Sequence, residues 1–392
     1  MKLVVVGMGQ CGGRIADEFA RLNKKAQSRR GIEIVTGAFA VNTDIADLSG
    51  LTRIKPDYQH RILIGGRKTG GHGVGKINEL GAEVAKEDAD KVIESIRTTT
   101  KRLPEADAFL LTAGAAGGTG SGSIPIMAKH IKERFADKPV YAVIILPFEH
   151  EEQTEERTIY NAATCLKSTY LTADAIIVVD NQRYIRKDSP LRANLNNINT
   201  MIVEPFYNLL CAGEEKKTQY IGAKVLDAGD IIQTLSGWTV IGHSSSNFSL
   251  FRSIFQRTRD FRNKVNETQK GIQAMDEAIA RLSVKCNPVD SRRALYLVSA
   301  PAKEMNMDMI KELGIYLKGM ARESIIRSGD YPRQGGSMDV SVILSELNDL
   351  AKVRNYFTRT ISLIANIKKK QEGLEGKFTA LDGSLRDIPS LL

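Results

Sequence analysis

Short apolar, often β-branched runs alternate with longer amphipathic segments through the first half of the chain. Several runs are apolar along their whole length, which is typical of strands covered by helices on both faces. The alternation predicts a doubly wound, mostly parallel α/β domain with ligand loops at the carboxyl ends of its strands. The expected strands are Leu3–Val6, Ile34–Val41, Ile62–Ile64, Ala108–Thr112, Val140–Leu146 and Ala175–Val179, and the expected helices lie near Gly12–Ala26, Ile77–Arg97, Ile124–Phe135 and Glu152–Tyr170.

The second half of the chain has a different pattern. Asn194–Leu210 predicts a long central helix, in which Pro205 should produce a kink. The polar segment Gly213–Gln219 is typical of a linker, and the strand-like runs and long amphipathic segments beyond it indicate a smaller α+β domain closed by a final helix, Leu350–Ile367. We therefore expect the α/β domain at residues 1–190, the central helix and linker at 191–220, the C-terminal domain at 221–370 and a tail at 371–392.

Composition excludes several classes of protein. The chain has 392 residues, of which 42% are hydrophobic and 26% charged, as in a globular protein of two or three domains. The net charge of +9 is spread along the chain, and we expect no nucleic-acid partner from it. The four cysteines form no CxxC pair, so we expect no protein-bound metal and a cytoplasmic location. No apolar run reaches the ~20 residues of a membrane span.

A glycine-rich turn follows the first expected strand. Gly7, Gly9 and Gly12 satisfy the GxGxxG pattern, which places a phosphate at a helix N-terminus. Alone, this pattern favours a Rossmann dinucleotide-dependent oxidoreductase. That class also needs an acidic residue about 20 residues beyond the glycines, whereas the second strand ends at Asn42-Thr43-Asp44, about thirty residues beyond them.

Two further glycine runs follow. Gly70–Ile77 nearly matches the P-loop pattern GxxxxGK[ST], but Ile77 stands where a hydroxyl would bind Mg²⁺, which argues against a Walker-type NTPase. The third run, Ala113–Ser123, lies between a buried strand and a helix. Its five glycines leave backbone N–H groups unshielded beside the hydroxyls of Thr119 and Ser121, an arrangement that suits a polyphosphate.

The order of these motifs resembles that of the tubulin/FtsZ superfamily. Gly117–Gly122 is similar to its [GA]GGTG[ST]G signature, Gly9–Gly12 resembles the GQCG loop of tubulins, and Asn42–Asp44 resembles the NTD of the second FtsZ loop. Thr69–His72 lies where the family has its γ-phosphate-sensing loop. A tubulin-like first loop on an otherwise FtsZ-like chain is most similar to the CetZ family.

The resemblance implies that GTP or GDP is the ligand and that Mg²⁺ is held mainly through the nucleotide. It also implies a cytoskeletal GTPase that polymerises head to tail with copies of itself. A role in cell shape follows from the likeness to CetZ, and an FtsZ-type division ring is the alternative. The nucleotide-binding residues that it implies in the loops are Gly9, Gln10, Cys11, Gly12, Gly13, Asn42, Asp44, Thr69, Gly70, Gly71, Gly114, Gly117, Gly118, Thr119, Gly120 and Ser121.

The resemblance also implies contacts to the base and the ribose. Asn181, after the sixth strand, and Asn199, on the central helix, take the positions of two guanine-binding asparagines, whose amides offer both a donor and an acceptor. A glutamate should contact the ribose. Counting back from Asn181 along the helix favours Glu155 or Glu156, whereas counting forward from Pro147 favours Glu151. We adopt the helical count, because insertions enter loops more easily than helices.

Hydrolysis in this family is completed between subunits by an NxDxxD loop. Val225–Asp230 matches both carboxylates, Asp227 and Asp230, but has Val225 in place of the asparagine. Two carboxylates three residues apart at a helix start can orient water, and Asp227 can also cap that helix. The last residues, Asp387–Leu392, resemble the FtsZ C-terminal peptide, which implies either a docking segment for a membrane-tethering partner or a tail that packs on the second domain.

Overall fold

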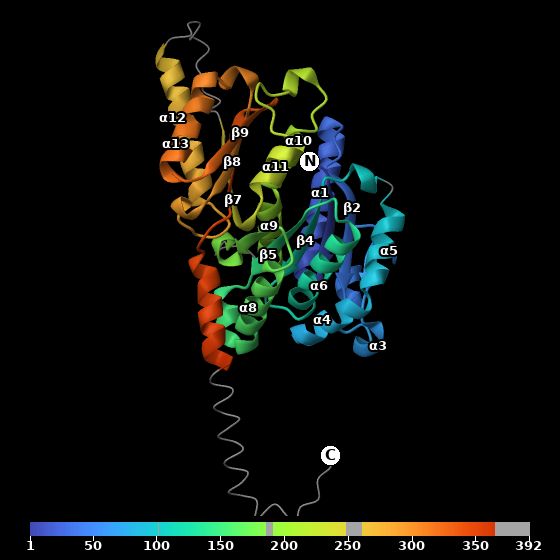
Figure 1. The fold of residues 1–392 in the computed structure, drawn as a ribbon. Helices are drawn as coiled ribbons and strands as arrows, with labels where there is room; N and C mark the ends of the chain where they lie inside the picture. The colour runs from blue at the N-terminus through green and yellow to red at the C-terminus, as the bar shows by residue number, and fades with distance from the viewer. Residues whose placement is uncertain (101, 186–190, 248–260, 365–392) are drawn as a thin grey trace, which may run out of the picture.

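The computed structural model describes residues 1–100, 102–185, 191–247 and 261–364. Its strands form one 10-stranded sheet in the order β3-β2-β1-β4-β5-β6-β7-β10-β8-β9, with helices on both faces (Figure 1). All neighbouring strands from β3 to β7 are parallel. The predicted doubly wound, mostly parallel α/β fold is therefore confirmed.

Strand β1 shows how the sheet of the first half is covered on both faces. Val4, Val6 and Met8 belong to one hydrophobic core, and Leu3 and Val5 belong to the other, because successive side chains of a strand point to opposite faces. The elements of this half are β1 (Leu3–Met8), α1 (Gly9–Arg30), β2 (Val35–Asn42), α2 (Ile45–Ser49), β3 (Arg61–Leu63), α3 (Gly66–Thr69), α4 (Asn78–Glu87), α5 (Ala89–Thr99), η1 (Leu103–Glu105), β4 (Ala108–Gly114), α6 (Thr119–Arg134), β5 (Val140–Leu146), α7 (Glu149–Thr154), α8 (Glu156–Tyr170), β6 (Ala175–Asp180) and η2 (Asn181–Tyr184).

The second half extends the same sheet through β7. This strand starts parallel to β6 and then runs antiparallel to β10, while β8 is antiparallel to β10 and parallel to the edge strand β9. Helix α12 packs against α13 and against β7 and β10. The predicted α+β arrangement is confirmed, although the pattern did not predict β9. The elements are η3 (Thr218–Tyr220), α11 (Ala228–Thr234), β7 (Gly237–Asn247), α12 (Phe261–Ala280), η4 (Pro288–Asp290), β8 (Arg293–Ala300), η5 (Ala302–Glu304), α13 (Met307–Met320), β9 (Ile325–Pro332) and β10 (Ser337–Ser345).

Two predicted helices are each divided in the structure. The central helix consists of α9 (Leu191–Val203) and α10 (Phe206–Ala212), separated at Pro205. Proline has no N–H to donate, and its ring clashes with the carbonyl oxygen four residues earlier. The helix is therefore interrupted at Pro205, where the sequence predicted a kink. The predicted helix Ile77–Arg97 is likewise divided into α4 and α5 at Asp88.

Residues 351–364 form the last helix of the described chain and lie beside α8 (Figure 1). Thr360 Oγ1 donates a hydrogen bond to the carbonyl oxygen of Ile159 at 3.4 Å. The predicted final helix is thus confirmed over these residues. The tail at 371–392, with the segment Asp387–Leu392, lies outside the described residues.

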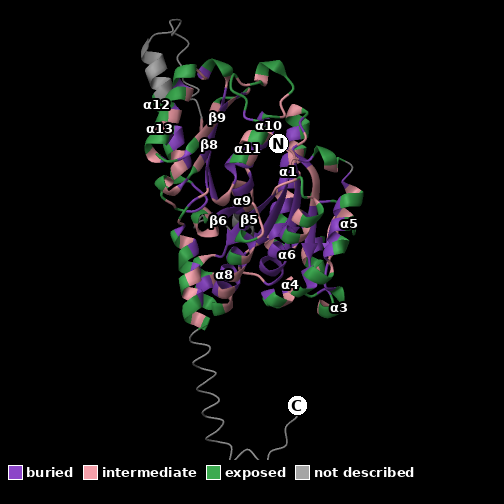
Figure 2. Ribbon diagram, viewed as in Figure 1, coloured by how far each residue is buried: buried purple, intermediate pink, exposed green. Residues whose placement is uncertain are grey.

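The strands of the first half are buried, and the exposed residues gather on the outer surfaces of the helices (Figure 2). None of the described helices is long and apolar enough to cross a membrane. The described residues also contain no group of three or more His, Cys, Asp or Glu side chains that could hold a metal ion.

Candidate nucleotide-binding site

The carboxyl ends of β1, β2, β4, β5 and β6 border a cavity of about 530 Å³, a volume typical of a small-molecule site. In doubly wound sheets, ligands bind at this edge. We call it the glycine-loop cavity. The predicted site residues that line it are Gly9, Gln10, Cys11, Asn42, Asp44, Gly114, Gly117, Gly118, Thr119, Gly120, Asn181 and Asn199.

The first wall of the cavity is the start of α1, which follows β1 directly. Gly9 has a φ of +67°, and a Cβ at Gly9 would lie 2.8 Å from Gly120 N, so both the backbone conformation and the close approach require glycine. No side chain of the described residues caps the first turn of α1. Its backbone N–H groups are therefore available to a ligand at the positive end of the helix.

The second wall is the start of α6, where Gly118 occupies the N-cap position, again without a side-chain cap from the described chain. The Thr119 and Thr43 hydroxyl oxygens lie 2.6 Å apart, which ties this loop to the end of β2. No described atom lies within 4 Å of a Cβ built at Gly117, so the loop backbone faces open space. Two helix N-termini thus border one cavity, which suits a polyphosphate.

Asp47, which is not among the predicted site residues, joins the first two loops. Its carboxylate accepts hydrogen bonds from Gln10 Nε2 at 2.6 Å and from Asn42 Nδ2 at 3.1 Å. Asp44 Oδ1 in turn accepts from Asp47 N at 3.1 Å and caps α2. The spacing of Asp44 and Asp47 matches an N-cap pattern, which was the available sequence signal.

Six of the residues predicted in the loops lie behind or beside the cavity lining. Gly12 is buried, and a Cβ there would lie 2.0 Å from Thr112 O, so this glycine permits close packing of α1 on β4. Thr69 Oγ1 and Gly73 N both donate to Thr43 O, at 3.3 and 3.1 Å, which brings the loop Thr69–Gly73 to the rim, where Gly73 lines the cavity. The six residues outside the lining are Gly12, Gly13, Thr69, Gly70, Gly71 and Ser121.

The far wall of the cavity combines amide and apolar side chains. Asn181 directly follows β6, and Asn199 projects from α9. Ile198 and Phe148 line the same cavity. An aromatic base could therefore contact apolar groups with its faces while its edge meets the donor and acceptor of an amide.

Glu151 occupies the place in the lining that we expected for Glu155 or Glu156. Glu151 lines the cavity, and its Oε2 accepts from Phe148 N at 2.8 Å. Glu155 and Glu156 do not belong to the described residues that line the cavity. Glu155 instead forms an ion pair with Lys76, and Glu156 is the first residue of α8. The count back from Asn181 assumed one continuous helix, whereas α7 and α8 are two helices that meet at Glu155.

Cys11 lines the cavity at the start of α1. Burial of the sulfur raises the pKa of the Cys11 thiol to about 12, and the nearby Glu151 carboxylate adds to the rise. The thiol therefore stays protonated at neutral pH. Because the thiolate is the nucleophilic form, the raised pKa argues against a nucleophilic role for Cys11 in this wall.

Asp227 and Asp230 lie far from the cavity of their own chain. Asp227 Oδ1 accepts from Asp230 N at 2.9 Å and caps α11, and Asp230 Oδ1 lies 3.3 Å from Arg327 Nε. Asp227 packs against Gly213, since a Cβ on Gly213 would lie 2.9 Å from Asp227 Cα. The next residue, Glu214, forms an ion pair with the amino group of Met1, which precedes β1.

The two aspartates therefore lie near the amino end of β1, whereas the cavity lies at its carboxyl end. The six residues of β1 span about 20 Å at the rise of a strand. Helix α3 ends at Thr69, where the loop at the rim of the cavity begins. Figure 1 likewise shows α11 and α3 toward opposite ends of the molecule. The capping role that we predicted for Asp227 is confirmed, but neither carboxylate can reach its own cavity.

The fold and this cavity define a GTPase-domain protein of the tubulin/FtsZ type. Residues 2–187 match the Tubulin/FtsZ family, GTPase domain, and residues 188–362 match the Tubulin-like CetZ, C-terminal domain. Over 385 residues, and 94% of each chain, the protein is 33% identical to Tubulin-like protein CetZ1 of Haloferax volcanii. The chain belongs to the CetZ family of tubulin-like proteins.

Two solved structures have the same fold over almost the whole chain. The GDP-bound monomer of CetZ1 from Haloferax volcanii superposes with a TM-score of 0.79 at 29% identity, covering 93% of this chain and 99% of the other. The GTPγS-bound protofilament of CetZ2 from Haloferax volcanii superposes with a TM-score of 0.80 at 27% identity, covering 94% and 100%.

Proposed function

We propose that this protein binds GTP and GDP in the glycine-loop cavity and hydrolyses GTP when a second copy stacks on it head to tail. The separation of Asp227 and Asp230 from their own cavity carries this proposal. Copies stacked in one direction would bring the α11 N-terminus of one copy to the cavity of the next. The GTPγS-bound CetZ2 protofilament, to which this chain is similar, supports such an arrangement.

In this proposal the nucleotide is held by three groups of residues. The phosphates bind the uncapped N-termini of α1 and α6, since backbone N–H groups and the helix dipole favour anions there. Asn181 and Asn199 bind guanine, and Glu151, in place of Glu155 or Glu156, contacts the ribose. Mg²⁺ would be held mainly through the phosphates and would neutralise part of their charge.

The chemistry needs positioning more than a strong base. Phosphoryl transfer is accelerated mainly by orientation of the attacking water and stabilisation of charge. Asp227 and Asp230 are exposed or half-exposed at a helix start, so they can reach a neighbouring copy. There they would orient the water, while the glycine loops stabilise charge on the phosphates with backbone N–H groups.

The experiment that tests this function measures phosphate release per subunit against protein concentration. A shared site predicts a rate that is near zero at low concentration and rises once filaments form, as seen by electron microscopy with GTP. The nucleotide that the purified protein releases should be GTP or GDP. A rate per subunit that is independent of concentration would overturn the shared site but not nucleotide binding.

The family suggests the cellular setting. We propose a cytoplasmic filament protein with a role in cell shape, and an FtsZ-type division ring is the alternative within the superfamily. Residues 371–392 would form the tail through which a partner tethers the filament to the inner membrane surface. The division of the chain near residue 190 is supported by the change from the GTPase-domain match to the CetZ C-terminal match at residues 187–188.

A further inference from the structure

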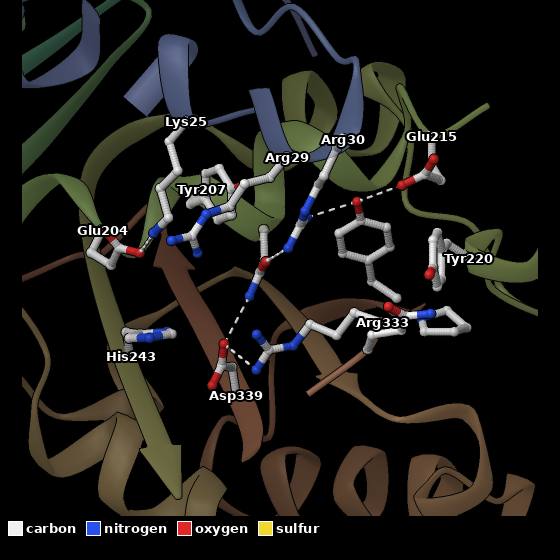
Figure 3. Close-up of a pocket in the computed structure, with 14 residues that line it drawn as sticks. Lys25, Arg29, Arg30, Glu204, Tyr207, Glu215, Tyr220, His243, Arg333 and Asp339 are labelled. Atoms are coloured by element: carbon white, nitrogen blue, oxygen red, sulfur yellow. Dashed lines mark hydrogen bonds and ion pairs between the residues drawn. The ribbon is translucent and has the colours of Figure 1, made fainter. Parts of the chain in front are cut away.

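A second cavity of about 340 Å³ lies at the other end of α1. Helix α1 has 22 residues and is about 33 Å long, and the two cavities lie at its opposite ends. The walls of this second cavity are the last turns of α1, the break between α9 and α10, the end of β9 and the start of β10 (Figure 3). It therefore lies between the two halves of the molecule, and we call it the basic cavity.

Four cations line the basic cavity, and two of them have ion-pair partners. Lys25 pairs with Glu204, and Arg333 Nη2 lies 2.6 Å from Asp339 Oδ2. The third lining carboxylate, Glu215, accepts a hydrogen bond from the Tyr331 hydroxyl. These three carboxylates are thus already engaged with other groups.

Arg29 and Arg30 have no carboxylate within ion-pair distance among the described residues. Figure 3 shows both side chains extending from α1 into the cavity, with Arg333 approaching from the opposite side. Arg30 uses one N–H on Tyr331 Oη at 2.7 Å and one on Asn208 Oδ1 at 3.2 Å. A guanidinium carries five N–H donors, so both arginines keep donors for a ligand.

The Arg30 guanidinium is held in one orientation. It lies 4.5 Å from the ring centroid of Tyr207 and 4.8 Å from that of Tyr331. The two rings and the two hydrogen bonds together restrict the rotamers of the Arg30 side chain. Arginine side chains otherwise lose much conformational entropy when they become ordered. A fixed guanidinium loses less entropy when it binds an oxyanion, which favours binding over a mobile surface arginine.

Two buried polar atoms beside these arginines lack partners in the described chain. The Tyr207 hydroxyl is unpaired although Tyr207 is only 5% exposed, and Arg333 Nε is also unpaired. A buried donor without a partner is energetically unfavourable, because it has lost its hydrogen bonds to water. Such atoms are expected where a ligand or water completes the hydrogen bonding.

A purely structural explanation accounts for part of this arrangement. Basic residues in the last turn of α1 favour the negative end of the helix dipole, and the ion pairs Lys25–Glu204 and Arg333–Asp339 join elements across the cavity. That explanation leaves the spare donors of Arg30 and the unpaired Tyr207 hydroxyl unexplained. Both lie at one cavity.

We propose that the basic cavity binds a small oxyanion, a compound bearing a phosphate or carboxylate group, through Arg29 and Arg30. Both groups match the fork of a guanidinium, which can donate two parallel hydrogen bonds to two oxygens. The site is separate from the glycine-loop cavity, and the proposal does not depend on GTP hydrolysis.

The test uses full-length protein saturated with GDP, so that added anions do not enter the glycine-loop cavity. Inorganic phosphate and citrate are titrated separately by calorimetry, in chloride buffer of constant ionic strength. The Arg29→Gln variant removes a positive charge that has no ion-pair partner among the described residues. The Arg30→Lys variant keeps the charge but removes the guanidinium, and with it the two parallel N–H donors. Lys24→Gln is the matched control, because Lys24 is exposed on the same helix outside the cavity lining.

The proposal predicts saturable binding of phosphate, citrate or both by the parent protein and by Lys24→Gln. Which of the two binds more tightly identifies the ligand group. Arg29→Gln and Arg30→Lys should each weaken binding about 10-fold, because each variant loses a charge-assisted hydrogen bond to the oxyanion; a 10-fold change corresponds to about 1.4 kcal/mol. Absence of binding by a folded parent protein, or equal weakening in Lys24→Gln and Arg29→Gln, would overturn the proposal.

Discussion

Arg359 Nη1 donates to Glu152 Oε2 at 2.6 Å and joins the helix at residues 351–364 to α7. Glu152 is only 7% exposed, and it also accepts from the Tyr356 hydroxyl and lies 3.3 Å from Lys352 Nζ. The preceding residue, Glu151, lines the glycine-loop cavity. The last described helix therefore anchors the short helix that forms one wall of the nucleotide site.

The first prediction concerns this ion pair. Arg359→Leu should lower the free energy of unfolding by about 1–3 kcal/mol, because it leaves a buried carboxylate with fewer partners. The measurement is urea unfolding followed by circular dichroism. Arg354→Leu is the matched control, since Arg354 is an exposed arginine on the same helix that pairs with exposed Asp349, and its loss should cost at most about 0.5 kcal/mol. Equal stability of both variants would mean that Lys352 and Tyr356 suffice for Glu152.

The sequence predicted the first half of the fold better than the second, for a physical reason. Strands covered on both faces are apolar along their length, and the predicted core strands contain such runs. Strand β9, by contrast, carries Arg327, Ser328 and Asp330 at the sheet edge, so hydrophobicity alone does not reveal it. The division of Ile77–Arg97 at Asp88 was not predicted, because the apolar spacing continues across it.

The glycine loops of the site were predictable because their function depends on the backbone. Gly9 has a positive φ, and at Gly12 the backbone of α1 lies against Thr112 O of β4. Both conditions require glycine, so both are visible in the sequence. Asp47 and Glu152 act by hydrogen bonds to residues that only the fold brings near. Single-sequence patterns do not record such contacts, and the choice between Glu151 and Glu155 depended in the same way on where one helix ends.

The second prediction tests the proposed shared site. Asp227→Asn keeps an oxygen that can accept from Asp230 N and cap α11, but removes the charge that would orient water. GTP affinity should be unchanged, whereas phosphate release in filaments should fall about 10²–10⁴-fold. Asp308→Asn, at the exposed start of α13, is the control and should keep full turnover. Normal turnover by Asp227→Asn would exclude a role of its charge.

The third prediction concerns recognition of guanine. Asn199→Asp replaces an amide donor by a carboxylate in the cavity lining and should weaken GTP binding by about 1–3 kcal/mol. Calorimetry with GTP measures the change. Asn197→Asp makes the same replacement at an exposed position of α9 and should leave the affinity unchanged. An unchanged affinity in Asn199→Asp would mean that Asn181 reads the base alone.

The fourth prediction separates packing from binding among the glycines. A Cβ in Gly12→Ala would lie 2.0 Å from Thr112 O, so α1 must move away from β4, at a cost of about 1–3 kcal/mol or more. Gly319→Ala, in α13, meets no described atom within 4 Å and should stabilise the protein by up to about 1 kcal/mol. Thermal unfolding of both variants measures the difference. A melting temperature of Gly12→Ala equal to that of the parent would show that the close approach is not required.

The last prediction concerns pH. Burial raises the pKa of the thiols of Cys11, Cys165 and Cys286 to about 12 and that of Cys211 to about 11, from a usual value of 9.0. At pH 8 a thiol with a pKa of about 12 is about 1000-fold less ionised than an ordinary cysteine, so reaction with a disulfide reagent should be slow in the native protein. In guanidinium chloride, all four thiols should react rapidly, which is the internal control.

The same pKa shifts predict how stability depends on pH. Each folded pKa lies above the unfolded value, so the unfolded chain loses its thiol protons first as the pH rises. The contribution to stability is therefore complete below pH about 9 and decreases between pH about 9 and 12. Urea unfolding at a series of pH values, compared between the parent protein and Cys11→Ser, measures the share of Cys11. In the experiment with the disulfide reagent, rapid reaction of one thiol of the native protein at pH 8, mapped to Cys11 by mass spectrometry, would contradict the raised pKa of that thiol.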